Sequence, residues 1–167
     1  MKTHTHNQDE HFMQLALAQA KMAGAQNEIP IGAVLVKDNQ VLASAHNSCE
    51  ADHTPLSHAE IKVIQSITRG QSNWRLNEHS LYVTLEPCLM CLGAILQARV
   101  SRLVFGAYDQ KKKELVADRS GIVGLNDQQI LHDNNHALSV TAGVLEEPCS
   151  ALLKDFFKKR RQSQDQS

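Results

Sequence analysis

Residues 81–91 read LYVTLEPCLMC, and this stretch predicts a strand that leads directly into a helix. Its first five residues are strand formers, and a proline then precedes a run from Cys88 to Arg99 with the composition of a helix. Residues three apart share one face of a helix, so Cys88 and Cys91 can direct both sulfurs at one ion. A helix N-terminus also favours the thiolate, which is the form that binds metals.

A second short motif, His58-Ala59-Glu60, opens another predicted helix. Together with Cys88 and Cys91, His58 makes a set of three zinc ligands. Structural zinc sites close with four protein ligands, whereas three ligands leave a position open for water or substrate. Bound zinc lowers the pKa of its water to about 7, and Glu60 can accept the proton that this water gives up. The order His-x-Glu and then Pro-Cys-x-x-Cys matches the pattern of zinc-dependent nucleobase deaminases.

Two other interpretations of the cysteine pair stay open. Cys88 and Cys91 can form a redox pair of the thioredoxin type, although this leaves the His-x-Glu motif without a role. The two cysteines can also belong to a closed structural zinc site. The fourth ligand of such a site would come from Cys49, His53 or Cys149.

The rest of the chain alternates between helical and strand patterns. Helices are predicted at about 11–25, 58–68, 88–99 and 147–161, and strands at 31–36, 41–45, 81–85, 102–106 and 138–142. The first two strands are close enough to form a hairpin. The stretch from Asp109 to His136 is the least periodic and is expected to be a long loop or a poorly patterned helix. We therefore expect an α/β fold with helices covering one sheet.

The composition fits one domain over residues 1–167, with flexible tails at about 1–8 and 162–167. The chain is 42% hydrophobic and carries 17 Lys and Arg against 18 Asp and Glu, which argues against global disorder and against an overall basic field. A nucleic acid would therefore bind to a local patch. No apolar run suits a membrane span and the N-terminal stretch has no secretory core, so we expect a cytoplasmic protein with no membrane partner.

Beyond these motifs, the chain resembles the bacterial tRNA-specific adenosine deaminases of the cytidine deaminase superfamily, which convert the wobble adenosine of an anticodon to inosine. The likeness covers nearly the whole chain. The matching stretches are residues 28–36, 46–47, 58–61, 81–91, 93–95, 102–107 and 149–157. The resemblance implies a single cytidine-deaminase-like domain, in which helices cover a central mixed sheet of about five strands as an α/β/α sandwich.

The resemblance also implies a role for each residue of the two motifs. His58, Cys88 and Cys91 would hold one Zn²⁺ per subunit. Glu60 would carry the proton while ammonia leaves C6 of the adenine.

Further substrate contacts are implied around these residues. Asn47 would form a hydrogen bond with the flipped base, and an amide in an apolar neighbourhood needs such a partner. Ile29 and Val83 would form apolar walls against the base, with ordinary core packing as the alternative account. Glu86 is expected near the same pocket.

RNA contact is expected on the last helix and at Asp109. The helix carries Lys154, Lys158, Lys159, Arg160 and Arg161, with Phe156 and Phe157 among them. Cations can neutralise phosphates, and Phe157 can stack on a splayed base. The alternative is a solvated basic helix end with two core phenylalanines. Asp109 matches a family residue beside the target nucleotide, whereas Tyr108 stands where the family has arginine.

The resemblance implies a homodimer that binds a tRNA anticodon stem-loop across its two subunits. Two other functions could use the same motifs. One is deamination of a free nucleobase such as guanine or cytosine, for which the same zinc ligands would serve. The other is a non-catalytic, zinc-stabilised module that binds RNA.

Overall fold

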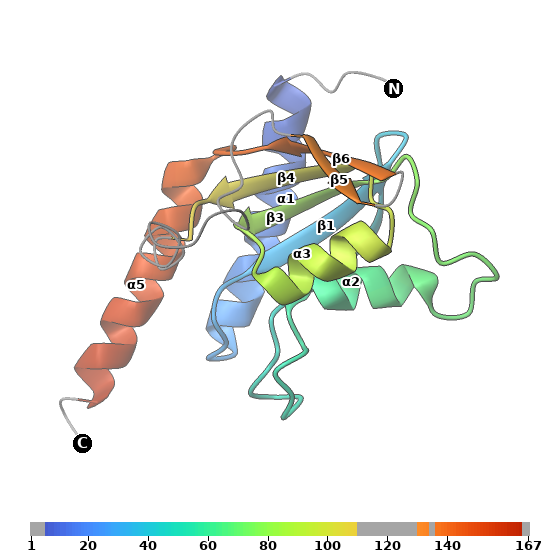
Figure 1. Cartoon of the computed structure of the whole chain (residues 1–167). Helices are drawn as coiled ribbons and strands as arrows, with labels where there is room; N and C mark the ends of the chain where they lie inside the picture. Colours follow the sequence, from blue (N-terminus) through green and yellow to red (C-terminus); the bar gives the residue numbers. More distant parts are fainter. Residues whose placement is uncertain (1–5, 110–129, 134–135, 165–167) are drawn as a thin grey trace, which may run out of the picture.

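The computed structural model describes residues 6–109, 130–133 and 136–164, which form one sheet with helices on both of its faces (Figure 1). The elements are α1 (His6–Ala25), β1 (Gly32–Lys37), β2 (Gln40–His46), α2 (Ala59–Thr68), β3 (Ser80–Leu85), α3 (Leu89–Gln97), β4 (Arg102–Ala107), β5 (Ile130–Asp133), β6 (His136–Thr141) and α5 (Glu146–Gln164). The α/β class, the mixed sheet and the β1–β2 hairpin expected from the sequence are confirmed.

The strand order in the sheet is β2-β1-β3-β4-β6-β5. β1 pairs antiparallel with both β2 and β3, and β5 pairs antiparallel with β6. In contrast, β4 runs parallel to β3 and to β6. A parallel pair needs a crossover connection, and α3 supplies it between β3 and β4. The carboxyl ends of β3 and β4 therefore meet at one edge of the sheet, where the chain enters α3.

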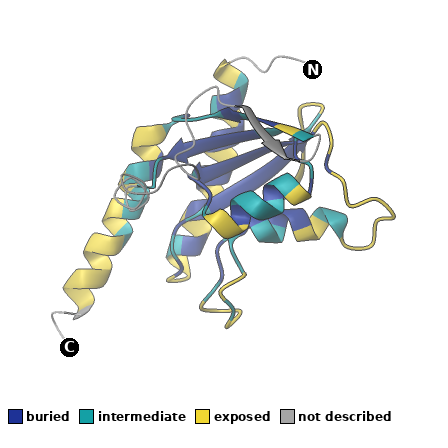
Figure 2. Cartoon of the chain, in the orientation of Figure 1, coloured by how far each residue is buried: buried dark blue, intermediate teal, exposed yellow. Residues whose placement is uncertain are grey.

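Each face of the sheet has its own hydrophobic core, because successive residues of a strand point to opposite faces. In β1, Ala33 and Leu35 belong to the core that includes residues of α2 and α3. Val34 and Val36 belong to the second core, which includes residues of α1 and α5. Figure 2 shows the central strands buried between these layers, while most of α5 is exposed.

A buried polar cluster joins α1 to the sheet. Both carboxylate oxygens of Asp9 accept hydrogen bonds from Arg102, each at 2.7 Å. The Tyr82 hydroxyl donates to Asp9 Oδ1 at 2.8 Å, and Arg102 Nη2 donates to Thr141 Oγ1 at 2.9 Å. A buried charge is costly unless it is paired and hydrogen-bonded, and this cluster meets both conditions. It therefore fixes α1 against β3, β4 and β6.

The structure differs from the sequence expectations at strand β5. This strand lies in the stretch that was expected to be a long loop or a poorly patterned helix. It has only four residues and forms the edge of the sheet by pairing with β6, so its stability depends on a neighbouring strand and not on a pattern of its own. Residues 110–129 and 134–135 of the same stretch lie outside the described residues.

The terminal helices are longer than the sequence pattern indicates. α1 begins at His6 and α5 continues to Gln164. Of the tails expected at about 1–8 and 162–167, residues 1–5 and 165–167 lie outside the described part of the chain, and the remainder is helical. None of the helices in the described part has both the length and the apolar character to cross a membrane.

Candidate active site

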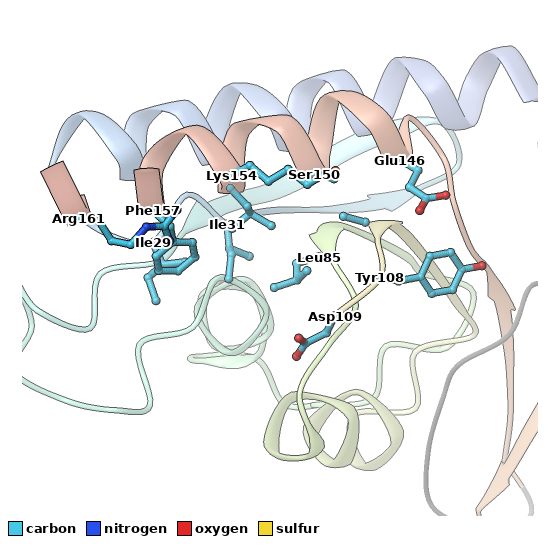
Figure 3. Close-up of a pocket in the computed structure, with 12 residues that line it drawn as sticks. Ile29, Ile31, Leu85, Tyr108, Asp109, Glu146, Ser150, Lys154, Phe157 and Arg161 are labelled. Atoms are coloured by element: carbon cyan, nitrogen blue, oxygen red, sulfur yellow. The ribbon is translucent and has the colours of Figure 1, made fainter. Parts of the chain in front are cut away.

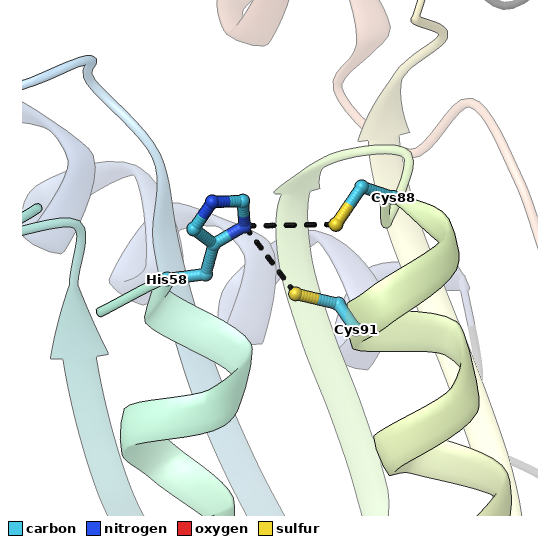
Figure 4. Close-up of side chains that lie close together, drawn as sticks. All are labelled: His58, Cys88 and Cys91. Atoms are coloured by element: carbon cyan, nitrogen blue, oxygen red, sulfur yellow. Dashed lines mark hydrogen bonds between the residues drawn. The ribbon is translucent and has the colours of Figure 1, made fainter. Parts of the chain in front are cut away.

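The ends of two helices bring the motif residues together. His58 is the N-cap of α2 and Cys88 is the N-cap of α3, and both have extended backbone angles. Neither side chain caps its own helix. Instead, the two side chains point toward each other, with Cys91 from the first turn of α3 beside them (Figure 4). The sequence placed both motifs at helix starts, and the structure confirms that position.

The spacing of the three side chains fits a tetrahedral zinc site. His58 Nδ1 lies 3.6 Å from Cys88 Sγ and 3.4 Å from Cys91 Sγ (Figure 4). Zinc bonds of about 2.0 Å to nitrogen and about 2.3 Å to sulfur, at a tetrahedral angle, separate the two ligand atoms by roughly 3.6 Å. One nitrogen and two sulfurs are also a common donor set for zinc. His58, Cys88 and Cys91 therefore fit this metal in chemistry and in geometry.

The environment of the two cysteines favours the thiolate at one of them. Hydrogen bonds from Cys91 and from His58 lower the pKa of Cys88 to about 3. The hydrogen bond to Cys88, together with burial, raises the pKa of Cys91 above its usual range. The positive ends of the α2 and α3 dipoles add to the attraction for negative charge. A divalent cation would release the second proton, because metals bind the thiolate form.

Glu60 lies in the first turn of α2, two residues after His58, and is only 3% exposed. Burial raises the pKa of its carboxyl group. Its Oε2 atom is buried and has no hydrogen-bond partner among the described residues. A buried acceptor without a partner is uncommon in folded proteins and calls for an explanation. A water or substrate atom beside the three ligands would supply the missing partner.

Asn47 is also buried and contacts the start of α2. Its Oδ1 atom accepts a hydrogen bond from the backbone N–H of Ala59 at 3.2 Å. Since His58 does not cap the helix itself, Asn47 satisfies one of the free N–H groups of the first turn. This capping role was not apparent from the sequence, because Asn47 precedes the helix by a whole loop. The amide nitrogen of Asn47 is the end that can donate to a substrate.

The two predicted apolar walls differ in exposure. Ile29 is half-buried and lines a cavity beside α5 (Figure 3). Val83, by contrast, is fully buried in the core that includes residues of α2 and α3, and it pairs with Ala33 across the sheet. Its burial favours the packing account of Val83. A contact between either side chain and a base stays a prediction.

Glu86 and Asp109 connect the end of β4 to the loop before α3. Glu86 is buried, and its Oε2 atom accepts a hydrogen bond from the backbone N–H of Asp109 at 3.1 Å. Its own N–H donates to the carbonyl of Ala107 at 2.8 Å. Glu86 stands two positions before Cys88, so these bonds fix the chain that carries two of the ligands.

The structure also bears on the alternative zinc ligands. In the described part of the chain, one group of three or more His, Cys, Asp and Glu has its ligand atoms within 4.8 Å of one another, and it consists of His58, Cys88 and Cys91. Cys149 is buried in the core between the sheet and the α1 and α5 helices. Cys49 is a free, half-buried cysteine outside the group. Among the described residues, neither Cys49, His53 nor Cys149 joins this group as a fourth ligand.

A feature that sequence reasoning missed is the cavity beside α5, of about 680 Å³ (Figure 3). Two predicted RNA contacts, Asp109 and Phe157, line it together with Ile29. So does Tyr108, which the sequence singled out only as a departure from the family. The helical spacing of α5 could have indicated which of its residues face one side, but not that a cavity lies there.

Comparisons with known proteins place the chain among the deaminases. The model of the MafB19-like deaminase family matches residues 7–161. The tRNA-specific adenosine deaminase of Buchnera aphidicola subsp. Baizongia pistaciae (strain Bp) is 40% identical over 156 residues, which are 93% of this chain and 92% of that protein. A structure solved in a study of A-to-I editing by tRNA:A34 deaminases at the wobble position of transfer RNA is 38% identical, with a TM-score of 0.68. That match covers 86% of this chain and 99% of the other.

A guanine deaminase structure from Bacillus subtilis is a weaker match. It is 33% identical, with a TM-score of 0.58, and the match covers 64% of this chain and 68% of the other. The fold and the His-Cys-Cys group define an enzyme of the deaminase class with a cytidine-deaminase-like fold. Within that class, the chain belongs to the family of tRNA-specific adenosine deaminases, which it matches at higher identity and along almost its full length.

Proposed function

We propose that this protein hydrolyses the wobble adenosine of a tRNA anticodon loop to inosine and releases ammonia. One Zn²⁺ per subunit would be held by His58, Cys88 and Cys91. The observation that carries the proposal is the placement of His58 Nδ1 within 3.6 Å of both sulfurs, at the N-terminus of the helix that also holds the buried Glu60. The full-length similarity to tRNA-specific adenosine deaminases supports the choice of substrate.

The proposed reaction replaces the amino group at C6 of adenine by an oxygen from water. When bound, zinc lowers the pKa of a coordinated water to about 7 and supplies a nucleophile at neutral pH. Glu60 would accept one proton of the attacking water and pass it to a ring nitrogen of the base, and the second proton of the water would go to the amino group, which leaves as ammonia. The burial of Glu60 and its partnerless Oε2 atom suit this role, because a buried acceptor without a partner can take a hydrogen bond or a proton from a bound water.

The remaining site residues would bind the substrate. Asn47 would donate its amide N–H to the flipped base, since its Oδ1 atom already caps α2. Ile29 and Val83 would contact the faces of the base, and Glu86 would hold the loop before Cys88. Asp109 would contact the backbone beside the target nucleotide, and Phe157 would stack on a neighbouring base.

We further infer that the protein is a homodimer in the cytoplasm and binds the anticodon stem-loop across two subunits. The resemblance to the family supports the dimer. The four cysteines, which are all free thiols in the structure, support the cytoplasm. Sedimentation at micromolar concentration should give the mass of a dimer. A monomer under these conditions would contradict the proposal.

The decisive experiment compares substrates. Purified, zinc-loaded protein is incubated with an anticodon stem-loop that has adenosine at the wobble position, and separately with free guanine, cytosine and adenine. Release of ammonia and formation of inosine are expected with the stem-loop and not with any of the free bases. The Glu60→Gln variant should bind zinc normally but lose activity by about 10²- to 10⁴-fold, the usual contribution of a general acid–base group.

Each remaining outcome selects another function. Turnover of a free base without turnover of the stem-loop would indicate a small-molecule deaminase. Stem-loop binding with no zinc-dependent ammonia release from any of these substrates would indicate a non-catalytic RNA-binding module.

A further inference from the structure

The loop of residues 47–58, between β2 and α2, joins two residues of the candidate active site (Figure 1). It begins at Asn47, which follows β2 directly, and ends at His58, the N-cap of α2. The Ser48 N–H donates to the carbonyl of Ser57 at 3.1 Å, so the two ends of the loop lie side by side. Since Asn47 and His58 flank this pair, the shape of the loop sets the distance between the proposed base contact and the proposed zinc ligand.

Side chains at the base of the loop form a chain of hydrogen bonds. Lys62 Nζ donates to Ser48 Oγ at 2.5 Å, and the Ser48 hydroxyl donates to Asp52 Oδ2 at 2.6 Å. The Lys62 ammonium also lies 3.9 Å from the same carboxylate oxygen. Hydrogen bonds from Ser48 and Ser57 lower the pKa of Asp52, so this carboxyl group is negatively charged at neutral pH. A cation and an anion therefore stand at the two ends of the chain, and hydrogen bonds to charged groups are stronger than those between neutral ones.

Lys62 belongs to the helix that carries the proposed chemistry. It stands one turn after His58 on the same face of α2, and its backbone N–H donates to the His58 carbonyl at 3.0 Å. The Lys62 side chain is 33% exposed, whereas Ser48 is buried. A buried hydroxyl group needs hydrogen-bond partners, and Lys62 and Asp52 provide a donor and an acceptor for it. These bonds join α2 to the residue next to Asn47.

Other contacts hold the loop from the side of the sheet. Glu28 is 2% exposed, and its Oε1 atom accepts a hydrogen bond from the backbone N–H of Ala51 at 2.8 Å. The Asn47 N–H donates to the carbonyl of Ile31 at 3.0 Å, just before β1. The loop is therefore held on one side by these contacts and on the other by Lys62.

We propose, on the basis of the proposed function, that Lys62 is a positioning residue for the deamination. Through Ser48 it holds Asn47 at a fixed distance from the proposed zinc ligands, so that a base bound at Asn47 meets the attacking water in the correct orientation. Lys62 itself does not touch the substrate. A misplacement of about 1 Å in an active site can cost roughly 10²-fold in rate, so the position of Asn47 matters for turnover.

The first test separates turnover from substrate affinity. kcat and KM for the stem-loop with wobble adenosine are measured for the zinc-loaded unmodified protein and for Lys62→Met, which keeps the length of the side chain but loses its charge and donors. We expect kcat to fall roughly 10-fold and KM to change by less than about 2-fold. Lys37→Met is the matched control. Lys37 is 35% exposed, pairs with Glu78 at 3.3 Å, and lies at the end of β1 that is remote from Ile31.

Double variants test whether Lys62 acts through its neighbours. In Asn47→Ala the side chain that Lys62 positions is already removed, so adding Lys62→Met should lower kcat by less than about 2-fold. Ser48→Ala should lower kcat as Lys62→Met does, and combining these two should cause little further loss. The urea midpoints of Lys62→Met and Lys37→Met should be alike, because each variant removes one partly exposed ion pair. A role of Lys62 in overall stability would give the full loss of kcat in every background.

A measurement without RNA reports on the loop itself. The Ser48 N–H closes the base of the loop, and the Ala59 N–H is bonded to Asn47. Amide hydrogen exchange at both positions in the zinc-loaded protein should be roughly 10-fold faster in Lys62→Met, because a hydrogen bond to a charged group that holds the loop is lost. Lys37→Met should leave both exchange rates unchanged.

The outcomes distinguish this proposal from the proposed function. An unchanged kcat in Lys62→Met, with an active unmodified protein, overturns the positioning role and leaves the deaminase activity standing. No deamination by the unmodified protein refutes the activity and this role together. A lower kcat without faster exchange, or one that persists in full with Asn47→Ala, would show that Lys62 acts by another route and overturns the proposal. A higher KM with a shallower salt dependence would assign Lys62 to a phosphate contact, which also overturns it.

Discussion

Asn47 illustrates how one residue can be assigned two functions that substitutions separate. Its Oδ1 atom caps α2 through the N–H of Ala59, and its amide nitrogen is proposed to bind the base. In Asn47→Asp an acceptor remains at the helix N-terminus, where negative charge is favourable, but the donor is lost. We expect Asn47→Ala to lower the free energy of unfolding by about 1 kcal/mol, and Asn47→Asp to lower it less.

Activity should respond differently from stability in these two variants. Both lack the amide donor, so kcat/KM on the stem-loop should fall by roughly 10-fold or more in each. Urea denaturation and steady-state kinetics on the same preparations check this expectation. Full activity in Asn47→Asp would assign Asn47 to capping alone.

Cys149 provides a prediction about alkaline pH. Burial raises the pKa of its thiol from the ordinary value of 9.0 to about 12. Between these two values the unfolded chain loses the proton and the folded chain keeps it. The free energy of unfolding should therefore fall as pH rises through this window, by at most about 1.4 kcal/mol per pH unit. Below pH 9 the thiol is protonated in both the folded and the unfolded chain, so it should contribute no pH dependence to the free energy of unfolding.

The comparison of variants isolates the contribution of this thiol. Urea denaturation between pH 8 and pH 11 should show a shallower decline for Cys149→Ala than for the unmodified protein. Cys49→Ala is the comparison: burial also raises the pKa of this half-buried cysteine, but less than that of Cys149, so its removal should flatten the decline by less. Equal declines in all three proteins would refute the assignment to Cys149.

The site residues differ in how far the sequence could predict them. His58, Glu60, Cys88 and Cys91 occur in two short motifs whose internal spacing reflects helix geometry, so their chemistry could be predicted locally. The approach of the two motifs depends on α2 and α3 crossing the same face of the sheet, which no local pattern encodes. The capping of α2 by Asn47 and the hydrogen bond from Asp109 to Glu86 were missed for the same reason.

At the level of the elements, close packing of helices on the sheet depends on two glycines. A Cβ at Gly106 in β4 would overlap Cys149 Sγ in α5 and lie 2.9 Å from the Thr84 carbonyl oxygen. A Cβ at Gly32 in β1 would overlap the Ala16 carbonyl oxygen and lie 2.5 Å from the Ala20 nitrogen in α1. The obstacle at Gly106 is partly the side chain of Cys149, whereas the two nearest atoms at Gly32 belong to the backbone of α1.

Alanine at the two glycines should therefore have different consequences. Gly106→Ala should destabilise the fold by about 1–3 kcal/mol, and combining it with Cys149→Ala should cost less than the sum of the two single variants. Gly32→Ala should cost more, because helix backbone cannot be trimmed. Gly93→Ala in α3 has no atom within 4 Å and should be neutral or slightly stabilising. Urea denaturation measures the four single variants and the double variant, and additive costs at Gly106 and Cys149 would refute the steric account.

The order of elements was largely predictable, whereas the edge of the sheet was not. The central strands β1, β3 and β4 are buried and rich in apolar residues, and the helices show helical periodicity. β5 has no comparable signal, because an edge strand of four residues gains its stability from pairing with β6. The sheet therefore has one strand more than the five that the sequence pattern indicated.

For the whole molecule, near-neutral charge and RNA binding are compatible. The formal net charge is -1, from 17 Lys and Arg against 18 Asp and Glu. A chain with this balance has no general attraction for polyanions, so specific contacts must select the RNA. The cations of α5 lie on an exposed helix whose C-terminal half projects beyond the sheet (Figure 1). These cations can supply phosphate contacts, whereas the choice of one loop must come from contacts to its bases.

Metal removal should affect the stability of the entire protein. The proposed zinc ligands join the N-termini of α2 and α3, so a bound ion would crosslink two helices that cover one core of the molecule. A ligand at 100 times its dissociation constant stabilises the folded state by about 2.7 kcal/mol. For a chain of 167 residues this corresponds to a rise in Tm of roughly 5–10 °C.

The test is a thermal melt with chelator, with restored zinc, and with His58→Ala as the control. Chelation should lower the Tm of the unmodified protein by that amount, and zinc should restore it. The Tm of His58→Ala should be lower at the outset and respond much less to either treatment, because two thiolates alone bind zinc weakly and do not span both helices. A Tm that is the same with and without zinc in the unmodified protein would show that His58, Cys88 and Cys91 do not hold a metal that stabilises the fold.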